Sequence, residues 1–287
     1  MKAPSGATLV ADGLRYAYPV GPTVIDDVAI EIRPRRRHVL LGGNGSGKST
    51  LLLLLNGSLR PAAGSVELGG RVLGYRRAAR NAHRRRVGLV FQDPDDQLFS
   101  ASVREEISFG PLNLGLSTGE AGARVDQVLA ELGLTDLADR PAHLLSYGQR
   151  KRVAIAGVAA MTPEIVLLDE PLAGLDPAAR VEVLATLDRL EAAGSTIAIT
   201  THDVDLALAW GDQATVLDHG RVVADGPAVE VLADPEALAA TRLRPPAVVT
   251  LAASLRSIGV LGDDDRPRSP ADLEQLIRNS RPGPVGP

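Results

Sequence analysis

The chain has 287 residues, with 31 Lys and Arg against 35 Asp and Glu and no cysteine. The net charge of −4 gives no general attraction to nucleic acid, and the lack of cysteine excludes disulfides and thiolate metal sites. Residues 1–13 contain no apolar segment of the kind found in signal peptides. The longest apolar run, Leu51–Leu55, is far shorter than the ~20 residues of a membrane-spanning helix. The chain is therefore not expected to cross a membrane on its own.

The N-terminal part is predicted to begin with strands and to continue into a phosphate-binding loop. Residues 8–32 are strand-rich with a turn at 21–22, and His38–Leu41 has the pattern of a buried strand. The segment 42–49, G-G-N-G-S-G-K-S, then matches the pattern G-x-x-x-x-G-K-[ST], and a helix is predicted to begin near Thr50.

Such a loop binds one class of ligand. Its glycines let backbone N–H groups turn towards the phosphates of a nucleoside triphosphate, Lys48 adds a cation, and the Ser49 hydroxyl can ligate Mg²⁺. The loop alone leaves kinases, GTPases, helicases and transporter ATPases open. The residues predicted to bind the nucleotide here are Gly42, Gly43, Asn44, Gly45, Ser46, Gly47, Lys48, Ser49 and Thr50.

The middle of the chain is predicted to be mostly helical. Arg84–Arg86 lead into a strand at 87–91, and this arginine run is interpreted as a solvated helix end rather than as a contact for acidic lipid. Helices are predicted at 102–108, 119–132 and 150–160.

Two acids follow a second buried strand. Ile165–Leu168 is entirely apolar and is followed by Asp169 and Glu170, as expected when the carboxyl end of a parallel strand delivers acids to a site. Asp169 is predicted to hold Mg²⁺, largely through water, beside Ser49. Glu170 could then polarise a water for attack on the γ-phosphate. The alternative is a strand end that carries two solvated acids.

The remaining elements alternate in type. A helix at about 178–193 is predicted from Asp176 as N-cap, Pro177 in the first turn and Gly194 just beyond its end. The later predictions are a strand at 196–199, a hairpin of 214–217 with 221–224, an amphipathic stretch at 248–258, a short helix at 272–277 and a disordered tail at 281–287.

One further motif indicates the family. Leu145–Gln149 reads L-S-Y-G-Q and lies between the phosphate loop and the acidic pair. In that position it resembles the signature of the ATP-binding-cassette ATPases, usually L-S-G-G-Q, with Tyr147 in place of the first glycine. Ser146 and Gly148 would supply a hydroxyl and a backbone N–H to a γ-phosphate at a helix N-terminus.

The resemblance implies a fold and a domain organisation. The expected class is α/β, a P-loop NTPase core of the ATP-binding-cassette type with an N-terminal β-subdomain and an inserted helical subdomain at about 93–160. Residues 1–240 would form the nucleotide-binding domain, and residues 241–287 a small C-terminal extension.

The resemblance also assigns further site residues. Gln92 matches the glutamine that touches Mg²⁺ and senses the membrane partner, and His202 matches the histidine that contacts the γ-phosphate. Tyr18 matches the aromatic that stacks on adenine, although Tyr16 lies two residues away on the same strand face. The catalytic set is thus Glu170, His202, Gln92 and Lys48, the Mg²⁺ set is Ser49, Gln92 and Asp169, and the additional nucleotide contacts are Tyr18, Ser146, Gly148, Gln149 and Asp176.

Within the family, the sequence at 91–99 and 145–157 resembles that of the energy-coupling-factor importers. Gly43 stands where that group more often has proline. The resemblance implies a peripheral protein at the cytoplasmic face of the cell membrane. It would pair head to tail with a second ATPase, identical or related, and bind integral membrane subunits near Gln92–Phe99. There Asp95 and Asp96 would meet basic partner residues or remain solvated.

The cargo is not encoded in the ATPase itself. The segments 91–99 and 145–157 most resemble the subgroup that imports cobalt or nickel, so a divalent metal is favoured as cargo. Importers of vitamins have nearly the same sequence in these segments. A soluble ATPase of DNA repair would usually carry coiled coils or zinc modules, which this sequence lacks. A non-catalytic relative would tend to lose Glu170 or His202, and both are present.

Overall fold

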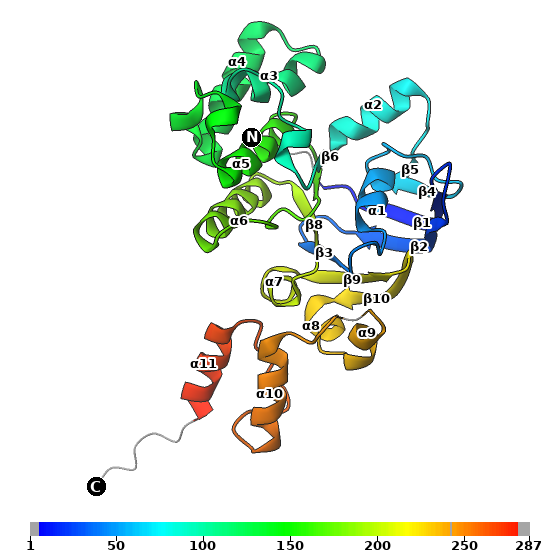
Figure 1. The fold of residues 1–287 in the computed structure, drawn as a ribbon, viewed down its shortest axis with the longest axis vertical. Helices are drawn as coiled ribbons and strands as arrows, with labels where there is room; N and C mark the ends of the chain where they lie inside the picture. Colours follow the sequence, from blue (N-terminus) through cyan, green and yellow to red (C-terminus); the bar gives the residue numbers. More distant parts are fainter. Residues whose placement is uncertain (1–5, 242, 281–287) are drawn as a thin grey trace.

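The computed structural model describes residues 6–241 and 243–280. A six-stranded sheet forms its centre, in the order β10-β9-β3-β8-β7-β6, and all neighbouring strands in it are parallel except β9 and β10. Helices of the inserted subdomain lie on one side of it and a second sheet on the other (Figure 1). The strands of the large sheet are β3 (His38–Leu41), β6 (Val87–Val90), β7 (Ile165–Leu168), β8 (Thr196–Thr201), β9 (Gln213–Asp218) and β10 (Arg221–Pro227).

The second sheet is antiparallel and has four strands in the order β2-β1-β4-β5. It confirms the predicted strand-rich N-terminal part, since the turn at 21–22 lies between the first two strands. Its strands are β1 (Leu9–Ala17), β2 (Thr23–Ile32), β4 (Ala63–Leu68) and β5 (Arg71–Val72).

The helical subdomain differs from the sequence prediction at two helix ends. Its first helix was predicted to stop at Ser108, but it continues to Asn113, with Gly110 packed closely on Met161 and Pro111 buried. Its last helix begins inside the signature, where the Ser146 side chain caps it. The helices are α3 (Val103–Asn113), α4 (Thr118–Leu132) and α5 (Tyr147–Ala159), with single 3₁₀ turns at Pro94–Asp96, Thr135–Leu137 and Ala142–Leu144.

The other helices cover the large sheet or extend from it. The arginine run forms the last turn of α2, as predicted, but it is only partly solvated, since Arg84 donates to the Gly57 carbonyl and Arg86 pairs with Glu164. Positive charge at a helix C-terminus is favourable to the helix dipole. These helices are α1 (Lys48–Leu55), α2 (Arg77–Arg86), α6 (Pro177–Ala192), α7 (Val204–Trp210), α8 (Ala228–Val231) and α9 (Pro235–Ala240).

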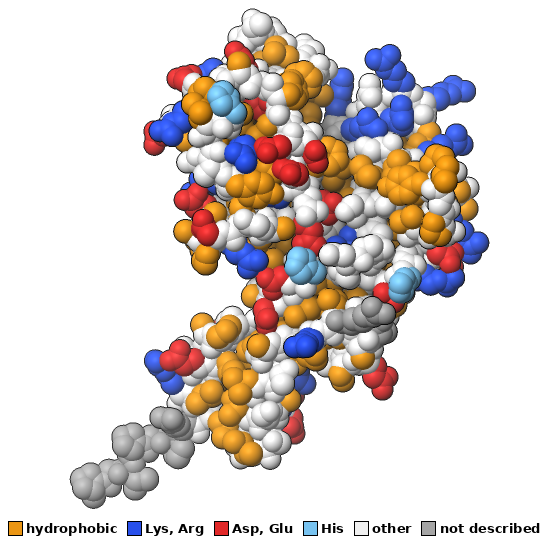
Figure 2. Space-filling model, viewed as in Figure 1, with side chains coloured by type: hydrophobic (Ala, Val, Ile, Leu, Met, Phe, Trp, Pro, Cys, Tyr) orange, Lys and Arg blue, Asp and Glu red, His pale blue; other side chains and the backbone are white. Residues whose placement is uncertain are grey.

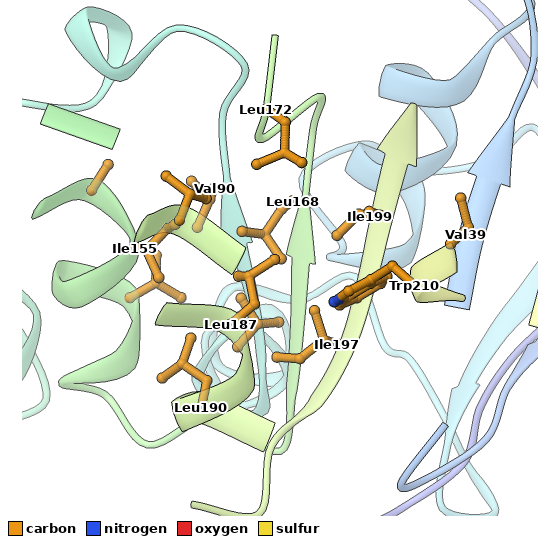
Figure 3. Close-up of a cluster of buried hydrophobic side chains, with 14 of the residues drawn as sticks. Val39, Val90, Ile155, Leu168, Leu172, Leu187, Leu190, Ile197, Ile199 and Trp210 are labelled. Carbon is orange, nitrogen blue, oxygen red and sulfur yellow. The ribbon is translucent and has the colours of Figure 1, made fainter. Parts of the chain in front are cut away.

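The core has two parts because side chains alternate along each strand of the large sheet. Val39 and Leu41 of β3 belong to the cluster beneath the helical subdomain, whereas Leu40 faces the second sheet. Figure 3 shows the first cluster, where Ile197 and Ile199 of β8 lie between side chains of α6 and Trp210 of α7. Burial on both faces explains why these strands are continuous apolar runs.

Two helices form the C-terminal extension, α10 (Ala247–Ser257) and α11 (Pro270–Ser280). Arg268 donates to the carbonyls of Leu208 and Gly211 at the end of α7, and the Ala247 N–H donates to Asp205 at the beginning of α7. The tail at 281–287, predicted to be disordered, lies outside the described residues. Within the described residues, no helix is both long and apolar enough to span a bilayer.

Candidate functional site

One cleft of about 430 Å³ lies at the carboxyl ends of three neighbouring strands. The phosphate loop follows β3, the acidic pair follows β7, and His202 follows β8. Because these strands are adjacent and parallel, their ends meet at one edge of the sheet. The predicted residues that line the cleft are Asn44, Gly45, Ser46, Gly47, Lys48, Ser49, Thr50, Gln92, Asp169, Glu170 and His202, and Val24 and Ala173 complete it.

The phosphate loop needs glycine at two positions for steric reasons. A Cβ on Gly42 would come within 2.4 Å of the Leu217 carbonyl oxygen. Gly47 has a φ of 105°, and a Cβ there would come within 3.0 Å of the Val24 carbonyl oxygen. A Cβ on Gly43, in contrast, would meet no described atom within 4 Å, so no steric reason demands glycine at this position.

Lys48 is buried between the phosphate loop and the acidic pair. Its Nζ donates to the carbonyls of Gly42 at 2.8 Å and Gly43 at 3.2 Å. The same atom lies 3.6 Å from Oε1 of Glu170, and both side chains are about nine-tenths buried. One cation therefore lies between the carbonyls of the loop and the carboxylate at the opposite wall of the cleft.

The acidic pair is held by a buried threonine. Thr200 on β8 donates from Oγ1 to Asp169 at 2.6 Å and accepts from the Glu170 N–H at 2.8 Å. Nδ1 of His202 lies 3.2 Å from the Glu170 carboxylate. Thr200 was not predicted as a site residue, although a hydroxyl within an apolar strand, next to the acids of the neighbouring strand, was a usable signal.

The two candidate tyrosines have different environments. The Tyr18 hydroxyl lies 3.2 Å from Oγ1 of Thr50 at the end of the phosphate loop, and its side chain is exposed. Tyr16 is partly buried and packs against the core of the second sheet. This placement favours Tyr18 for contact with a ligand, although Tyr18 stands beside the cleft and does not line it.

The signature residues and Asp176 lie away from the cleft. The Ser146 hydroxyl accepts a hydrogen bond from the Gln149 N–H, and the Gln149 side-chain oxygen accepts one from the Ser146 N–H. Together these two bonds form a capping box at the start of α5. Gly148 is buried, and a Cβ on it would come within 2.8 Å of Ala179. Asp176 caps α6 by accepting from the Ala179 N–H at 2.8 Å. These four predicted residues are thus not brought together with the phosphate loop of their own chain.

Comparison with known proteins fits this geometry. A family model described as ABC transporter matches residues 25–173, more than half of the chain. The chain belongs to the ABC transporter family. The predicted fold class and the predicted ATPase identity are therefore confirmed.

Relatives of this ABC ATPase include importer subunits. It is 54% identical over 246 residues to the cobalt import ATP-binding protein CbiO of Rhodobacter capsulatus, covering 86% of this chain and 88% of that protein. It is 45% identical over 240 residues to the energy-coupling factor transporter ATP-binding protein EcfA of Carboxydothermus hydrogenoformans, covering 84% of this chain and 88% of that protein.

A solved structure has the same fold. The protein cbiO1 of Clostridium perfringens, described as part of the ABC transporter complex cbiONQ, superposes with a TM-score of 0.74 at 40% identity. The match covers 86% of this ABC ATPase and 99% of that chain. The resemblance to the energy-coupling-factor importers, read from residues 91–99 and 145–157, is therefore confirmed.

Proposed function

We propose that this ABC ATPase binds ATP in the cleft and hydrolyses it to drive a membrane importer of the energy-coupling-factor type, and that the cargo is cobalt. The observation that supports hydrolysis is the convergence of Lys48, Glu170 and His202 in one cleft with the phosphate loop. The cobalt assignment is supported by the CbiO relative, which has higher identity than the EcfA relative over a similar span.

The cleft fits Mg²⁺ as the cofactor of the reaction. The Ser49 hydroxyl, the Gln92 amide and the Asp169 carboxylate line it together, and oxygen donors are the ligands that Mg²⁺ prefers. Among the described residues, no group of three or more His, Cys, Asp or Glu side chains could hold a metal on its own. Phosphate oxygens would therefore complete the coordination. When bound, the ion would neutralise negative charge on the phosphates.

The side chains of the cleft have distinct roles in this proposal. Lys48 would leave the loop carbonyls for the phosphates, and Glu170 would accept a proton from a water that attacks the γ-phosphorus. The new bond joins that water oxygen to phosphorus, and the bond to the bridging oxygen of ADP breaks. His202 would contact the γ-phosphate and hold the Glu170 carboxylate in place.

A second ATPase subunit would complete the site. Ser146, Gly148, Gln149 and Asp176 lie at the beginnings of α5 and α6, away from their own cleft. In a head-to-tail pair they would approach the ATP that is bound to the other subunit, and closure would exclude water from it. Whether the second subunit is an identical or a related chain stays open.

The surface near Gln92–Phe99 supports a membrane partner. All three phenylalanines of the chain, Phe91, Phe99 and Phe109, are exposed, and the rings of Phe99 and Phe109 contact each other edge to face. Exposed aromatic clusters mark interaction sites.

Figure 2 shows acidic side chains gathered where the helical subdomain meets the rest of the molecule. Because Asp95 already pairs with Arg150 at 2.9 Å, Asp96 is the better candidate for a basic partner residue. This docking would place the chain at the cytoplasmic face of the membrane.

The experiment that tests hydrolysis is Glu170→Gln. The variant keeps the shape of the side chain but cannot accept the proton, so kcat should fall about 100-fold or more while ATP still binds. Size-exclusion chromatography with ATP should show an accumulated dimer. Hydrolysis at the wild-type rate would refute the proposed role of Glu170.

The experiment that tests transport is purification of the tagged chain from membranes in mild detergent, followed by mass spectrometry and by uptake assays with radioactive cobalt. Copurified integral membrane proteins and ATP-dependent cobalt uptake are the expected results. Uptake of nickel or of a vitamin instead would correct the cargo. Recovery without any membrane protein would refute the importer proposal and leave the ATPase intact.

A further inference from the structure

Lys151 is a buried cation that has no role in the mechanism above. It is one of only three lysines in the chain, with Lys2 and Lys48, and it is fully buried on α5. Its Nζ donates to the backbone carbonyl of Glu170 at 3.2 Å and to that of Gln92. One side chain on the signature helix therefore contacts the backbone of two residues that line the cleft.

The Glu170 backbone needs such support. Its φ is 42°, in the left-handed region that non-glycine residues rarely adopt, and strained conformations persist only where their surroundings fix them. On one side the Glu170 N–H donates to Thr200. On the other side its carbonyl accepts from the Ala173 N–H at 3.1 Å and from Lys151. Lys151 is the only one of these contacts that comes from the helical subdomain.

Lys151 stays largely protonated although it is buried. Burial lowers the pKa of Lys151 to about 8, and the nearby carboxylates of Asp169, Asp93 and Glu170 act in the opposite direction. The ammonium is therefore largely protonated at neutral pH. The Tyr147 ring lies 5.9 Å from Nζ, within the range of a cation–π contact. Tyr147, the departure from the usual signature, thus covers the lysine.

We propose that Lys151 is a positioning residue, which fixes the peptides of Glu170 and Gln92 relative to α5 and so aligns the Glu170 carboxylate for hydrolysis. It touches no reacting atom. Because α5 begins at the signature, movement of this helix would reach the cleft through Lys151. The inference rests on the proposed role of Glu170.

The test compares Lys151→Met with Arg152→Met. Arg152 lies on the same helix and also donates to two backbone carbonyls, those of Leu132 and Gly133, but it contacts neither Glu170 nor Gln92. Lys151→Met should lower kcat about tenfold or more with the KM for ATP changed less than about threefold, since a small misplacement of a catalytic group is costly. Arg152→Met should lower Tm and leave kcat within about twofold of wild type.

The absence of cysteine allows a rescue experiment. In Lys151→Cys the single thiol can be alkylated with 2-bromoethylamine in the unfolded state, which forms a C–S bond, releases bromide and restores an ammonium at nearly the original reach. Refolded, alkylated protein should recover kcat at least about fivefold relative to the unalkylated variant. Wild-type protein taken through the same treatment is the control, and this pair carries the test if Lys151→Met does not fold.

The outcomes separate this inference from the proposed function. Wild-type kcat in Lys151→Met, or a loss no larger than that of Arg152→Met, would overturn the positioning role, as would alkylation that restores Tm without kcat. If Glu170→Gln is inactive and Lys151→Met is normal, only this inference fails. If Glu170→Gln hydrolyses ATP at the wild-type rate, the proposed role of Glu170 fails, and this inference, which rests on that role, fails with it.

Discussion

At the scale of single residues, the site depends on a few buried polar groups that fix the acids. Thr200 is fully buried and both donates to Asp169 and accepts from the Glu170 N–H. A buried donor or acceptor that loses its partner has a high free-energy cost. The position of the acidic pair thus depends on a buried residue that does not itself line the cleft.

The first prediction concerns Thr200→Val, which keeps the shape but removes the hydroxyl. The free energy of unfolding should fall by about 1–3 kcal/mol because the Glu170 N–H is left unpaired, and kcat should fall about tenfold or more. Urea unfolding and steady-state ATPase assays measure both. Thr186→Val is the matched control, since Thr186 is equally buried but bonds only within α6. Equal effects of the two variants on kcat would contradict the role of Thr200.

The second prediction concerns pH and His38 on β3. Its ring is buried, with Nε2 2.8 Å from Oγ1 of Thr215, and burial lowers the pKa of His38 to about 4 from an ordinary value of 6.5. The unfolded chain therefore binds a proton between pH 6.5 and 4 that the folded chain does not. Stability is fully present above pH 6.5 and should fall by about 3 kcal/mol as pH drops through this window.

Urea unfolding at a series of pH values measures that slope. His38→Gln removes the titrating group and should flatten the dependence by close to one proton. His143→Gln, at an exposed site, should keep the slope of wild type. A slope that is the same in all three proteins would show that His38 does not govern this pH dependence.

At the scale of elements, helix beginnings carry both stability and the groups that face a second subunit. Asp176 accepts from the Ala179 N–H at the start of α6, and Ser146 caps α5 in the same way. Capping satisfies backbone N–H groups that have no partner within the helix. The same residues are the ones proposed to contact ATP on the other subunit, so the two uses must be separated by substitution.

The third prediction separates them at Asp176. Asp176→Ala removes the cap and should cost about 1 kcal/mol of stability, whereas Asp176→Asn keeps the cap and should cost little. If the carboxylate serves the subunit interface, both variants should lose ATP-dependent dimerisation in the background of Glu170→Gln. Normal dimerisation of Asp176→Asn would confine Asp176 to its capping role.

At the scale of the whole molecule, the C-terminal extension is attached to the helix that follows His202. Arg268 and Ala247 contact the end and the beginning of α7, and Val248, Ala252, Leu261 and Leu273 join the main core. The cleft contains none of the described residues of the extension, so the extension can affect it only indirectly, through α7 and the core. The domain boundary near residue 240 stays a prediction.

The fourth prediction concerns Arg268→Met. Loss of the bonds to Leu208 and Gly211 should weaken docking of α11 by about 1–3 kcal/mol, which hydrogen exchange of the α11 amides would detect as faster exchange, with the KM for ATP unchanged. Arg278→Met is the control, because among the described residues Arg278 forms only an exposed pair with Glu274 on the same helix. Faster exchange in both variants would contradict a specific role for Arg268.

Most of the residues that line the cleft and most of the elements were predicted from the sequence alone. The phosphate loop, the acids after β7 and the histidine after β8 are short patterns whose residue types follow from the ligand. Buried strands such as Ile165–Leu168 are recognisable because both faces are apolar. For the same reason the caps of α6 were predicted correctly, since capping needs only neighbours in sequence.

What depends on distant contacts could be read only from the tertiary structure. The continuation of α3 past Gly110 follows from packing that local propensity does not encode, whereas the start of α5 is set by the local capping box of Ser146 and Gln149, which the sequence prediction missed. The hydrogen bonds of Thr200 to the acidic pair and of Lys151 to Gln92 and Glu170 join residues that are 19 to 59 positions apart. The left-handed backbone of Glu170 occurs at the residue where these bonds meet. Hydrogen bonds at such separations exist only once the sheet has brought its strand ends together.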